Sequence, residues 1–295
     1  MLRLASSIMS AQTNLPKFNH MNDKTENLNK MVSELVKSGA TEEARILMRK
    51  AGLKHHPELA SEETEKWLTK FITIDTEMIQ MKSDIRRLSN VDDTVLIVGE
   101  SGTGKEIIAH ALHGGRDEGK FIPINCAALP ENLIESELFG HIQGAFTGAT
   151  QTKDGLFTAA GKGTVFLDEI GELSLPMQAK FLRAIQEKTI RRIGANDENK
   201  IYCRIIAGTH QNLSAMVKEK LFRLDLFQRL SRFEVATKPL VQRRDDIPEM
   251  IKKLDEEAQL PDEIIEKIKN WSDLSGNVRT VENLVRRYIV LGRLD

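Results

Sequence analysis

An apolar stretch that runs directly into a glycine-rich turn constrains this chain more than any other feature. Residues 94–98 read Thr-Val-Leu-Ile-Val, as in a buried strand, and residues 99–106 follow as Gly-Glu-Ser-Gly-Thr-Gly-Lys-Glu. The three glycines let the backbone turn so that consecutive N–H groups converge on one anion. Residues 107–112 are helical in composition, and a helix N-terminus favours negative charge. The stretch therefore predicts a phosphate-binding loop between a strand and a helix.

We expect this loop to bind the phosphates of a nucleotide, with Lys105 reaching the β- and γ-phosphates. The candidate nucleotide-binding residues are Gly99, Glu100, Ser101, Gly102, Thr103, Gly104, Lys105 and Glu106. The general pattern has Ser or Thr after the lysine to bind Mg²⁺, whereas this chain has Glu106 at that place. A metal ion would therefore depend on a ligand from elsewhere in the chain.

The composition is typical of a globular protein with a sizeable core. The chain has 295 residues, 40% hydrophobic and 29% charged, which allows one large or two modest domains. A net charge of −1 gives no general attraction to nucleic acid or anionic membranes. The two cysteines, Cys126 and Cys203, lie far apart in apolar runs, which suits reduced thiols in the cytoplasm. No apolar run approaches the ~20 residues that span a membrane, so we expect no membrane partner.

The N-terminal part has a helical pattern of its own. Residues 1–23 are polar without periodicity, and we expect them to be disordered. Apolar residues at helical spacing predict one helix over 28–36, ending near Gly39, and a second over 41–51. We interpret residues 1–70 as an N-terminal helical segment of unknown role. It is either a packing or oligomerisation element or a regulatory, partner-binding module.

Strands and helices alternate after the glycine-rich turn. The β-rich runs are 121–126, 163–168 and 203–208. The helical stretches between them lie near 131–139, 174–187 and 213–219. Such alternation predicts an α/β fold with a mainly parallel sheet between helices.

The strands are expected to cease after Pro239. Helices are predicted over 248–256, 262–270 and 278–291. We therefore expect an α/β nucleotide-binding subdomain over residues 71–238 and a small all-α lid over residues 239–295.

Two carboxylates follow the apolar run at 163–168. Asp168 and Glu169 come at its carboxyl end, which is the edge where ligands bind in open α/β sheets and also the edge of the glycine-rich loop. Asp168 is placed to hold Mg²⁺, and Glu169 to take a proton from the water that attacks the γ-phosphate. The alternative is an acidic pair that only caps the following loop.

Three segments together resemble the AAA+ domain of bacterial enhancer-binding proteins, the sigma-54-dependent transcription activators. They are the glycine-rich loop, the run Glu-Ser-Glu-Leu-Phe-Gly-His at 135–141, and the hexapeptide Gly-Ala-Phe-Thr-Gly-Ala at 144–149. The resemblance covers about residues 72–291, and a glutamate after the loop lysine is usual in that family. It implies an AAA+ P-loop fold that binds ATP and Mg²⁺ and hydrolyses ATP.

The hexapeptide is the most specific part of the resemblance. Phe146 and Thr147 lie between glycines, so a large apolar ring stands on a segment too flexible to hold it easily in a core. In the family this loop engages sigma-54, which makes Gly144, Ala145, Phe146, Thr147, Gly148 and Ala149 the candidate partner-binding residues. The alternative is a hairpin tip whose phenylalanine folds back on the domain.

The resemblance also assigns roles close to the phosphate site. Asn125 matches the asparagine that switches the catalytic glutamate, here Glu169, between engaged and disengaged positions. Thr209 and His210, at the end of the run 203–208, match sensor I. The resemblance therefore places Asn125 and Thr209 among the catalytic residues.

Three arginines complete the expected site. By resemblance, Arg223 and Arg229 reach the γ-phosphate of the neighbouring subunit, which implies a homo-oligomeric ring, expected to be a hexamer. The alternative for these two is ordinary ion pairing on a helix surface. Arg279, in the run Gly-Asn-Val-Arg at 276–279, matches sensor II, the lid arginine that contacts nucleotide.

The C-terminal part departs from the family pattern. Leu274-Ser275 stands where Trp-Pro is usual, Val241-Gln242-Arg243 replaces the usual Leu-Arg-Glu-Arg ending, and the stretch 247–277 is shorter than typical. The chain ends at Asp295, soon after the last predicted helix. We therefore expect no helix-turn-helix for sequence-specific DNA binding, and no receiver domain. Either the protein activates from solution or the chain is truncated.

The expected function is that of an ATP-hydrolysing transcriptional activator, which remodels the sigma-54 RNA polymerase holoenzyme so that the promoter can open. The shortened lid motivates an alternative, a nucleotide-dependent regulatory or scaffold ring without productive turnover. A helicase-like motor would need a basic channel, which the near-neutral composition does not support.

Overall fold

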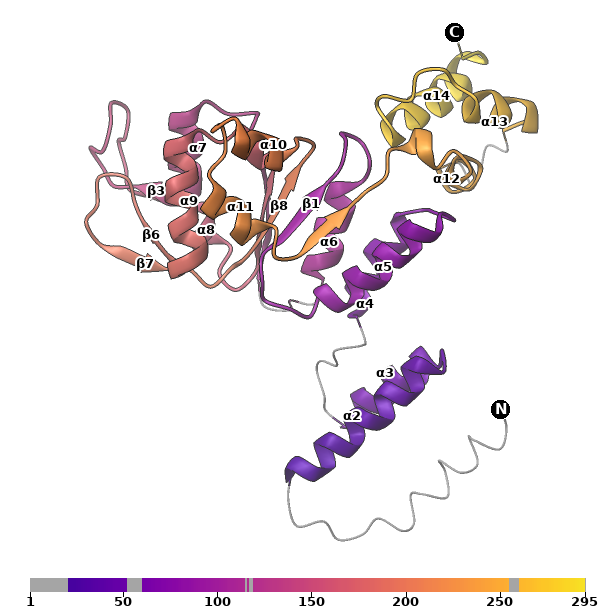
Figure 1. Cartoon of the computed structure of the whole chain (residues 1–295), viewed down its shortest axis with the longest axis horizontal. Coiled ribbons are helices and arrows are strands. Elements are labelled where there is room, and N and C mark those ends of the chain that lie inside the picture. Colours follow the sequence, from indigo (N-terminus) through magenta and orange to yellow (C-terminus); the bar gives the residue numbers. More distant parts are fainter. Residues whose placement is uncertain (1–20, 52–59, 115, 117–118, 255–259, 295) are drawn as a thin grey trace. The chain divides into compact units, whose positions relative to one another are not determined.

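The structure is a computed structural model, and it describes residues 21–51, 60–114, 116, 119–254 and 260–294. The chain divides into two compact units, at Leu59 and Ala60 (Figure 1). None of the described helices is both long and apolar enough to cross a membrane. Most of the segment expected to be disordered, residues 1–20, lies outside the described residues.

The N-terminal unit contains a helical hairpin. α2 (Met21–Lys37) and α3 (Thr41–Ala51) are joined at Gly39, which has the left-handed φ of +80° that favours glycine. Val32, Ala44 and Met48 are buried between the two helices. Both predicted helices are confirmed. The expectation of disorder was wrong for residues 21–23, because α2 already begins at Met21.

Two further helices lead to the sheet. α4 (Glu62–Lys70) begins after Ser61, an N-cap whose hydroxyl accepts a hydrogen bond from the N–H of Thr64 at 3.1 Å. α5 (Thr76–Leu88) is capped in the same way by Asp75. The apolar stripe of α5 is buried, so this helix packs against the core.

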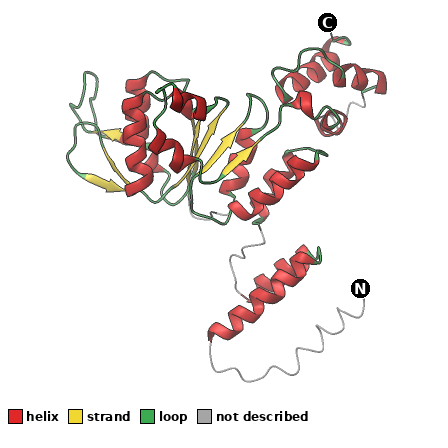
Figure 2. Cartoon of the chain, in the orientation of Figure 1, coloured by secondary structure: helices red, strands yellow, loops and turns green. Residues whose placement is uncertain are grey.

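The central sheet has five strands in the order β2-β5-β8-β1-β9, drawn in yellow in Figure 2. The strands are β1 (Val95–Val98), β2 (Phe121–Asn125), β5 (Thr164–Asp168), β8 (Arg204–Thr209) and β9 (Glu234–Ala236). All their pairings are parallel, which confirms the predicted sheet type. β9 was not predicted, because three residues on a sheet edge carry too short a pattern to be recognised.

Helices cover both faces of this sheet, as predicted. They are α6 (Lys105–His113), α7 (Glu131–Phe139), α8 (Leu156–Ala159), η1 (Ile170–Glu172), α9 (Leu175–Glu187), α10 (Leu213–Lys218) and α11 (Leu224–Leu230). Alternate residues of a strand point to opposite faces. In β5, Val165 and Leu167 therefore join the core under α7 and α9, whereas Phe166 joins the core under α5 and α6.

Two small hairpins, which were not predicted, stand beside the sheet. β3 (Gly140–His141) pairs with β4 (Lys153–Asp154), and β6 (Thr189–Arg191) pairs with β7 (Glu198–Lys200). The hairpins are joined where the N–H of Ile193 donates to Gly140 O at 2.9 Å. The hexapeptide 144–149 therefore rises from the β3–β4 hairpin next to the turn that follows β6.

The C-terminal helices have a core of their own. η2 (Leu240–Gln242), α12 (Asp246–Leu254), α13 (Asp262–Lys269) and α14 (Val278–Leu291) surround a cluster that includes Ile247, Ile268, Val281 and Leu284. The predicted helix over 278–291 is confirmed with the same bounds. α12 begins two residues before the predicted helix over 248–256, whose last two residues lie outside the described residues.

Candidate functional site

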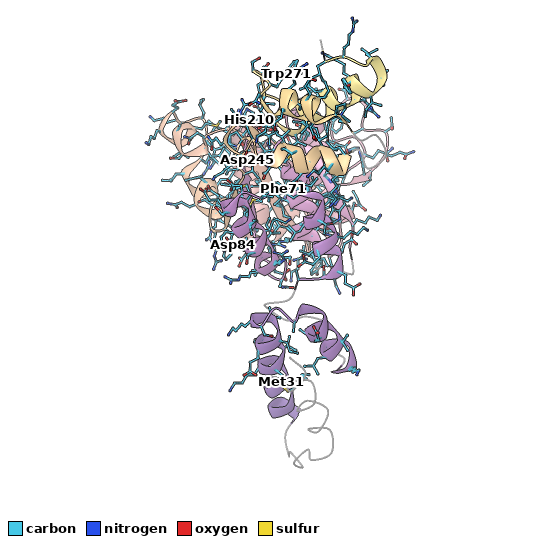
Figure 3. All side chains as sticks on the ribbon, turned by 90° about the vertical axis from the view of Figure 1, so that its right-hand side faces the viewer. Met31, Phe71, Asp84, His210, Asp245 and Trp271 are labelled. Atoms are coloured by element: carbon cyan, nitrogen blue, oxygen red, sulfur yellow. The ribbon has the colours of Figure 1, made fainter. Side chains whose placement is uncertain are left out.

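The glycine-rich loop joins β1 to α6 as predicted, and its geometry depends on glycine, as Gly104 and Gly99 illustrate. Gly104 has a φ of +105° and directly precedes α6. A Cβ on Gly104 would also lie 3.0 Å from the ring of Phe71, which is labelled in Figure 3. A Cβ on Gly99 would lie 1.8 Å from Thr237 Oγ1. The loop is therefore wrapped closely by parts of the chain before and after it.

Lys105 lies inside this loop and is only 6% exposed. Its Nζ donates to Gly99 O at 2.9 Å and to Glu100 O at 3.4 Å, and it lies 3.4 Å from Glu169 Oε1. These partners bring one negative charge to the buried ammonium group. Phosphate oxygens could replace the neutral carbonyls as stronger, charge-assisted acceptors.

Glu169 follows β5 in a left-handed conformation, with φ 56° and ψ 51°. Its Oε2 accepts a hydrogen bond from the N–H of His210 at 3.2 Å and lies 2.6 Å from His210 Nδ1. Burial by itself would raise the pKa of Glu169, but the His210 hydrogen bonds and the Lys105 charge together lower it below its usual value. Glu169 is therefore an ionised carboxylate, able to accept a proton.

Asp168, the last residue of β5, is the candidate magnesium ligand. The pKa of Asp168 is raised, chiefly by burial. The charge on Lys105 lowers this pKa, whereas the carboxylates of Glu169 and Glu106 raise it further. Among the described residues no group of three or more His, Cys, Asp or Glu side chains could hold a metal ion. Mg²⁺ in nucleotide sites commonly takes one or two carboxylates, with water and phosphate oxygens completing its octahedron. One half-buried carboxylate with acidic neighbours fits that donor set.

Asn125 and Thr209 end the strands on either side of β5. Asn125 lies opposite Asp168, and its side-chain oxygen accepts the N–H of Ala127 at 2.8 Å. The Thr209 hydroxyl is buried and accepts the N–H of Gln211 at 3.0 Å. Glu169 is held by His210, the second residue of the predicted sensor I pair, and by Lys105.

A cleft of about 350 Å³ is lined by Lys105, Asn125, Asp168 and Glu169, but not by Thr209 or His210. Its walls come from the loop, the ends of β2 and β5, the segment between α4 and α5, and the C-terminal helices. The lining residues are Lys70, Phe71, Ile72, Ser101, Gly102, Thr103, Gly104, Lys105, Glu106, Ile107, Asn125, Asp168, Glu169, Arg243, Met250, Leu254, Val278, Arg279 and Glu282. The apolar wall, including Phe71, Met250 and Leu254, was not found from the sequence, because its residues belong to no motif.

The C-terminal helices are fastened to the loop mainly by Asn277. Its buried amide group donates to Glu100 Oε2 at 3.1 Å and to Ser101 O at 3.0 Å, and its oxygen accepts the N–H of Leu240 at 2.6 Å. The φ of Asn277 is +53°, uncommon for a residue with a side chain. Arg279 donates to Ser101 Oγ at 3.2 Å, so the predicted sensor II arginine lies beside the phosphate loop.

A buried ion pair forms a second attachment. Arg243 Nη1 lies 2.9 Å from Asp246 Oδ2, and both side chains are 1% exposed. Asp246 also accepts hydrogen bonds from Thr73 Oγ1 at 2.7 Å and from the N–H of Ile74 at 2.6 Å. The Arg243 guanidinium lies 5.2 Å from the ring centre of Phe71. This pair therefore joins α12 to the segment that forms one wall of the cleft.

Arg223 and Arg229 do not line the cleft of their own chain. Arg223 precedes α11 and pairs with Asp225 through Nε at 3.0 Å and Nη2 at 2.7 Å. Arg229, in the last turn of α11, is exposed and makes no hydrogen bond or ion pair with the described residues. Surface ion pairing therefore accounts for Arg223 but not for Arg229.

The hexapeptide forms a closed tip that is exposed except at Ala145, which is half-buried, and Ala149, which is buried. The N–H of Gly144 donates to Ala149 O at 2.9 Å, and Gly144 and Gly148 have φ values of +80° and +103°. Phe146 is 41% exposed, and its ring centre lies 5.0 Å from that of His141. The ring of Phe146 therefore contacts the ring of His141 and does not enter the core. Thr147 is exposed.

A family of sequences described as the sigma-54 interaction domain matches residues 71–236. The response regulator protein PilR of Pseudomonas aeruginosa is 44% identical over 225 residues, which are 72% of this chain and 50% of PilR. The regulatory protein AtoC of Escherichia coli is 44% identical over 231 residues, 75% of this chain and 50% of AtoC. The chain thus spans about half the length of these curated relatives.

Solved structures show the same fold. NtrX from Brucella abortus in complex with ATP is 29% identical, with a TM-score of 0.68 over 88% of this chain and 59% of that chain. The S. cerevisiae Hsp104–ADP complex is 18% identical, with a TM-score of 0.55 over 91% of this chain and 56% of that chain, and shows the fold alone. The chain has the α/β AAA+ fold and belongs to the family of the sigma-54 interaction domain, that of the bacterial enhancer-binding proteins.

Proposed function

We propose that this protein binds ATP with Mg²⁺, hydrolyses it, and uses the cycle to remodel the sigma-54 RNA polymerase holoenzyme for promoter opening. The observation that carries the proposal is the convergence of Lys105, Asp168 and Glu169 in one cleft beside the phosphate loop. The family of the chain supports the proposal. So do the crystal structures of a related protein, NtrX, in complex with ATP and with ADP. We propose a cytoplasmic location.

Phosphate binding would exchange the partners of Lys105. Its ammonium group would leave Gly99 O, Glu100 O and the Glu169 carboxylate for phosphate oxygens, while the N–H groups of the loop cradle the same phosphates. Arg279, beside Ser101, would contact the nucleotide from the lid. The exchange frees one oxygen of Glu169 toward the cleft.

Glu169 would then act as the general base. Its carboxylate is ionised and held by His210, so it can orient a water molecule and accept its proton. Asp168 would hold Mg²⁺, which supplies positive charge to neutralise the phosphate oxygens. We propose that Asn125 and Thr209 adjust the position of Glu169, since both lie at the ends of strands flanking β5.

The arginines of α11 would act on a neighbouring copy. Arg229 is exposed, makes no hydrogen bond or ion pair with the described residues, and does not line its own cleft, which fits a residue that acts in another subunit. Arg223 would have to exchange its pairing with Asp225 for a phosphate. We therefore propose a homo-oligomeric ring, a hexamer by analogy with the family.

We retain the division into an N-terminal segment (1–70), a nucleotide-binding subdomain (71–238) and a lid (239–295) as a proposal, with α4 (Glu62–Lys70) packed in the compact unit that begins at Ala60. The lid has its own hydrophobic cluster, and the buried Arg243–Asp246 pair fastens it to the rest. A lid held in this way can respond to nucleotide as one body.

Thr147 gives the sharpest test of the partner. Thr147→Ala removes one hydroxyl and one methyl group from an exposed tip that does not line the cleft, so ATP hydrolysis should stay within about twofold of wild type. Capture of sigma-54 in the presence of a transition-state analogue should be lost. Thr150→Ala, at an exposed threonine just outside the hexapeptide, is the matched control and should retain capture.

The outcomes separate the parts of the proposal. Capture by Thr147→Ala as strong as by wild type, or no capture by either protein, would remove the activator function and leave an ATPase. A protein that binds ATP but shows no turnover even at high concentration would instead be the regulatory or scaffold ring that the shortened lid suggests.

A further inference from the structure

Ala145 and Phe146, which are neighbours in the hexapeptide, make contacts of different kinds. A Cβ on Gly194 would lie 2.9 Å from Ala145 Cβ, so Ala145 packs closely against the turn after β6. Phe146, one residue further on, has an aromatic contact with His141, at 5.0 Å between ring centres and 66° between planes. This edge-to-face arrangement is one of the two favoured for neighbouring rings. The base of the tip is therefore packed against protein, whereas its phenylalanine leans on His141.

His141 is held much more firmly than the ring it supports. Its backbone pairs with Lys153 in the β3–β4 hairpin and bridges to Ile193. Its Nδ1 lies 2.8 Å from the hydroxyl of Ser136, which is buried on α7. Phe146 stands between two glycines with positive φ, and its carbonyl accepts the N–H of Ala149 at 3.0 Å, while its side chain is 41% exposed. The pair thus consists of an imidazole with a buried hydrogen-bond partner and a phenylalanine ring that is partly exposed.

Ser136 connects this pair to the rest of the domain. α7 begins at Glu131, soon after Asn125 at the end of β2, and the N–H of Gly140 donates to Ser136 O as the helix ends. A shift of α7 would therefore carry Ser136 and His141 together and change the support under Phe146.

We propose that His141 is a positioning residue, anchored by Ser136, which seats Phe146 in the resting loop and releases it when the loop engages a partner. The proposal rests on the proposed role of residues 144–149 as the contact to sigma-54. It adds a contact that would hold the loop before a partner binds: the ring of Phe146, which is 41% exposed, meets the imidazole of His141 on the same chain.

Chymotrypsin, which cleaves after aromatic residues, can measure the seating without sigma-54. In the full chain, His141→Ala should speed cleavage after Phe146 by about 3- to 10-fold, because the ring loses its support. Cleavage after Tyr202, which is 68% exposed and lies outside the hexapeptide, is the internal control and should not change. His141→Phe keeps an aromatic seat and should stay within about twofold of wild type.

Ser136→Ala provides a second, milder variant, because it leaves the imidazole in place but removes its anchor. The rate of cleavage after Phe146 in Ser136→Ala should lie between the rates in wild type and in His141→Ala. Cleavage after Phe146 that stays at the wild-type rate in both His141→Ala and Ser136→Ala would overturn the proposal. Equal acceleration at Tyr202, or a His141→Phe protein cleaved as fast as His141→Ala, would overturn it as well.

Capture of sigma-54 then tests separately whether His141 positions Phe146 and whether residues 144–149 contact sigma-54. His141→Ala should capture sigma-54 without a transition-state analogue, which wild type should not do. If wild type fails to capture sigma-54 even with the analogue, the proposed partner is wrong, and the cleavage rates still decide whether His141 seats Phe146. If wild type captures but the cleavage rates do not respond to His141→Ala, only the seat is wrong.

Discussion

The nucleotide cleft and the hexapeptide loop are built in opposite ways. Lys105 is 6% exposed and held by three oxygens from two parts of the chain, whereas Phe146 is 41% exposed and leans on one ring. Strand ends of a closely packed sheet place the groups of the cleft, and two short hairpins carry the loop. Under the proposed function, the groups that would act on ATP are held by several contacts, whereas the group that would meet a partner is exposed.

Arg229 is an exception to this contrast, because it is exposed and we nevertheless expect it to take part in ATP hydrolysis in the cleft of a neighbouring copy. Arg229→Ala should lower ATP turnover by about 10³- to 10⁵-fold, the range for an arginine supplied in trans, and leave nucleotide affinity nearly unchanged. Turnover and nucleotide binding are measured on the same protein. Mixing Arg229→Ala with Glu169→Gln protein should restore some activity, since each supplies what the other lacks. No rescue at any mixing ratio would indicate that Arg229 acts only within its own subunit.

Within the cleft, substitutions of Lys105 and of Glu169 should impair different steps, ATP binding in the first case and ATP turnover in the second. Lys105→Ala should remove ATP binding, because the phosphates lose a buried charged donor. Glu169→Gln should keep binding and lower turnover by about 10²- to 10⁴-fold, because an amide does not accept the proton. Nucleotide titration and single-turnover hydrolysis measure the two effects. Equal losses of binding in both variants would contradict the assigned roles.

The attachment of the lid should be costly to break. Asp246→Asn leaves the Arg243 guanidinium buried without a counter-charge, and we expect the free energy of unfolding to fall by about 3–5 kcal/mol. Asp245→Asn changes the neighbouring exposed carboxylate, which pairs with Lys269, and serves as the control with little expected effect. Denaturant unfolding of both variants measures the difference. Similar losses of unfolding free energy in Asp246→Asn and Asp245→Asn would show that burial of the Arg243–Asp246 pair does not determine how much the pair contributes to stability.

His210 should have the smallest effect, visible mainly as a pH dependence. Its hydrogen bonds help to lower the pKa of Glu169, so in His210→Ala that pKa should rise and the carboxylate should become protonated at higher pH. The acid limb of the pH–rate profile should therefore move to higher pH, while turnover near pH 8 changes less than about threefold. His210→Gln, which retains a donor, should keep the wild-type limb. Coincident acid limbs in His210→Ala and wild type would argue against the contact.

Contiguous segments carried most of what could be predicted from the sequence. The phosphate loop, the Asp168–Glu169 pair at the end of a strand, and the bounds of α14 follow from residue types at short spacing, since strand and helix periods act over a few residues. The hairpins and β9 were missed, because elements of two or three residues have no period to read. The roles of the predicted site residues remain predictions until the variants are measured.

The sequence by itself determined which chemical groups this protein has at its strand ends and in its loops. Only the tertiary structure decided which of them meet. Phe71 closes on Gly104, Asn277 reaches Glu100, and His210 contacts Glu169 across long stretches of chain. Such contacts depend on how whole helices and strands pack, and no local pattern encodes the position of a distant side chain.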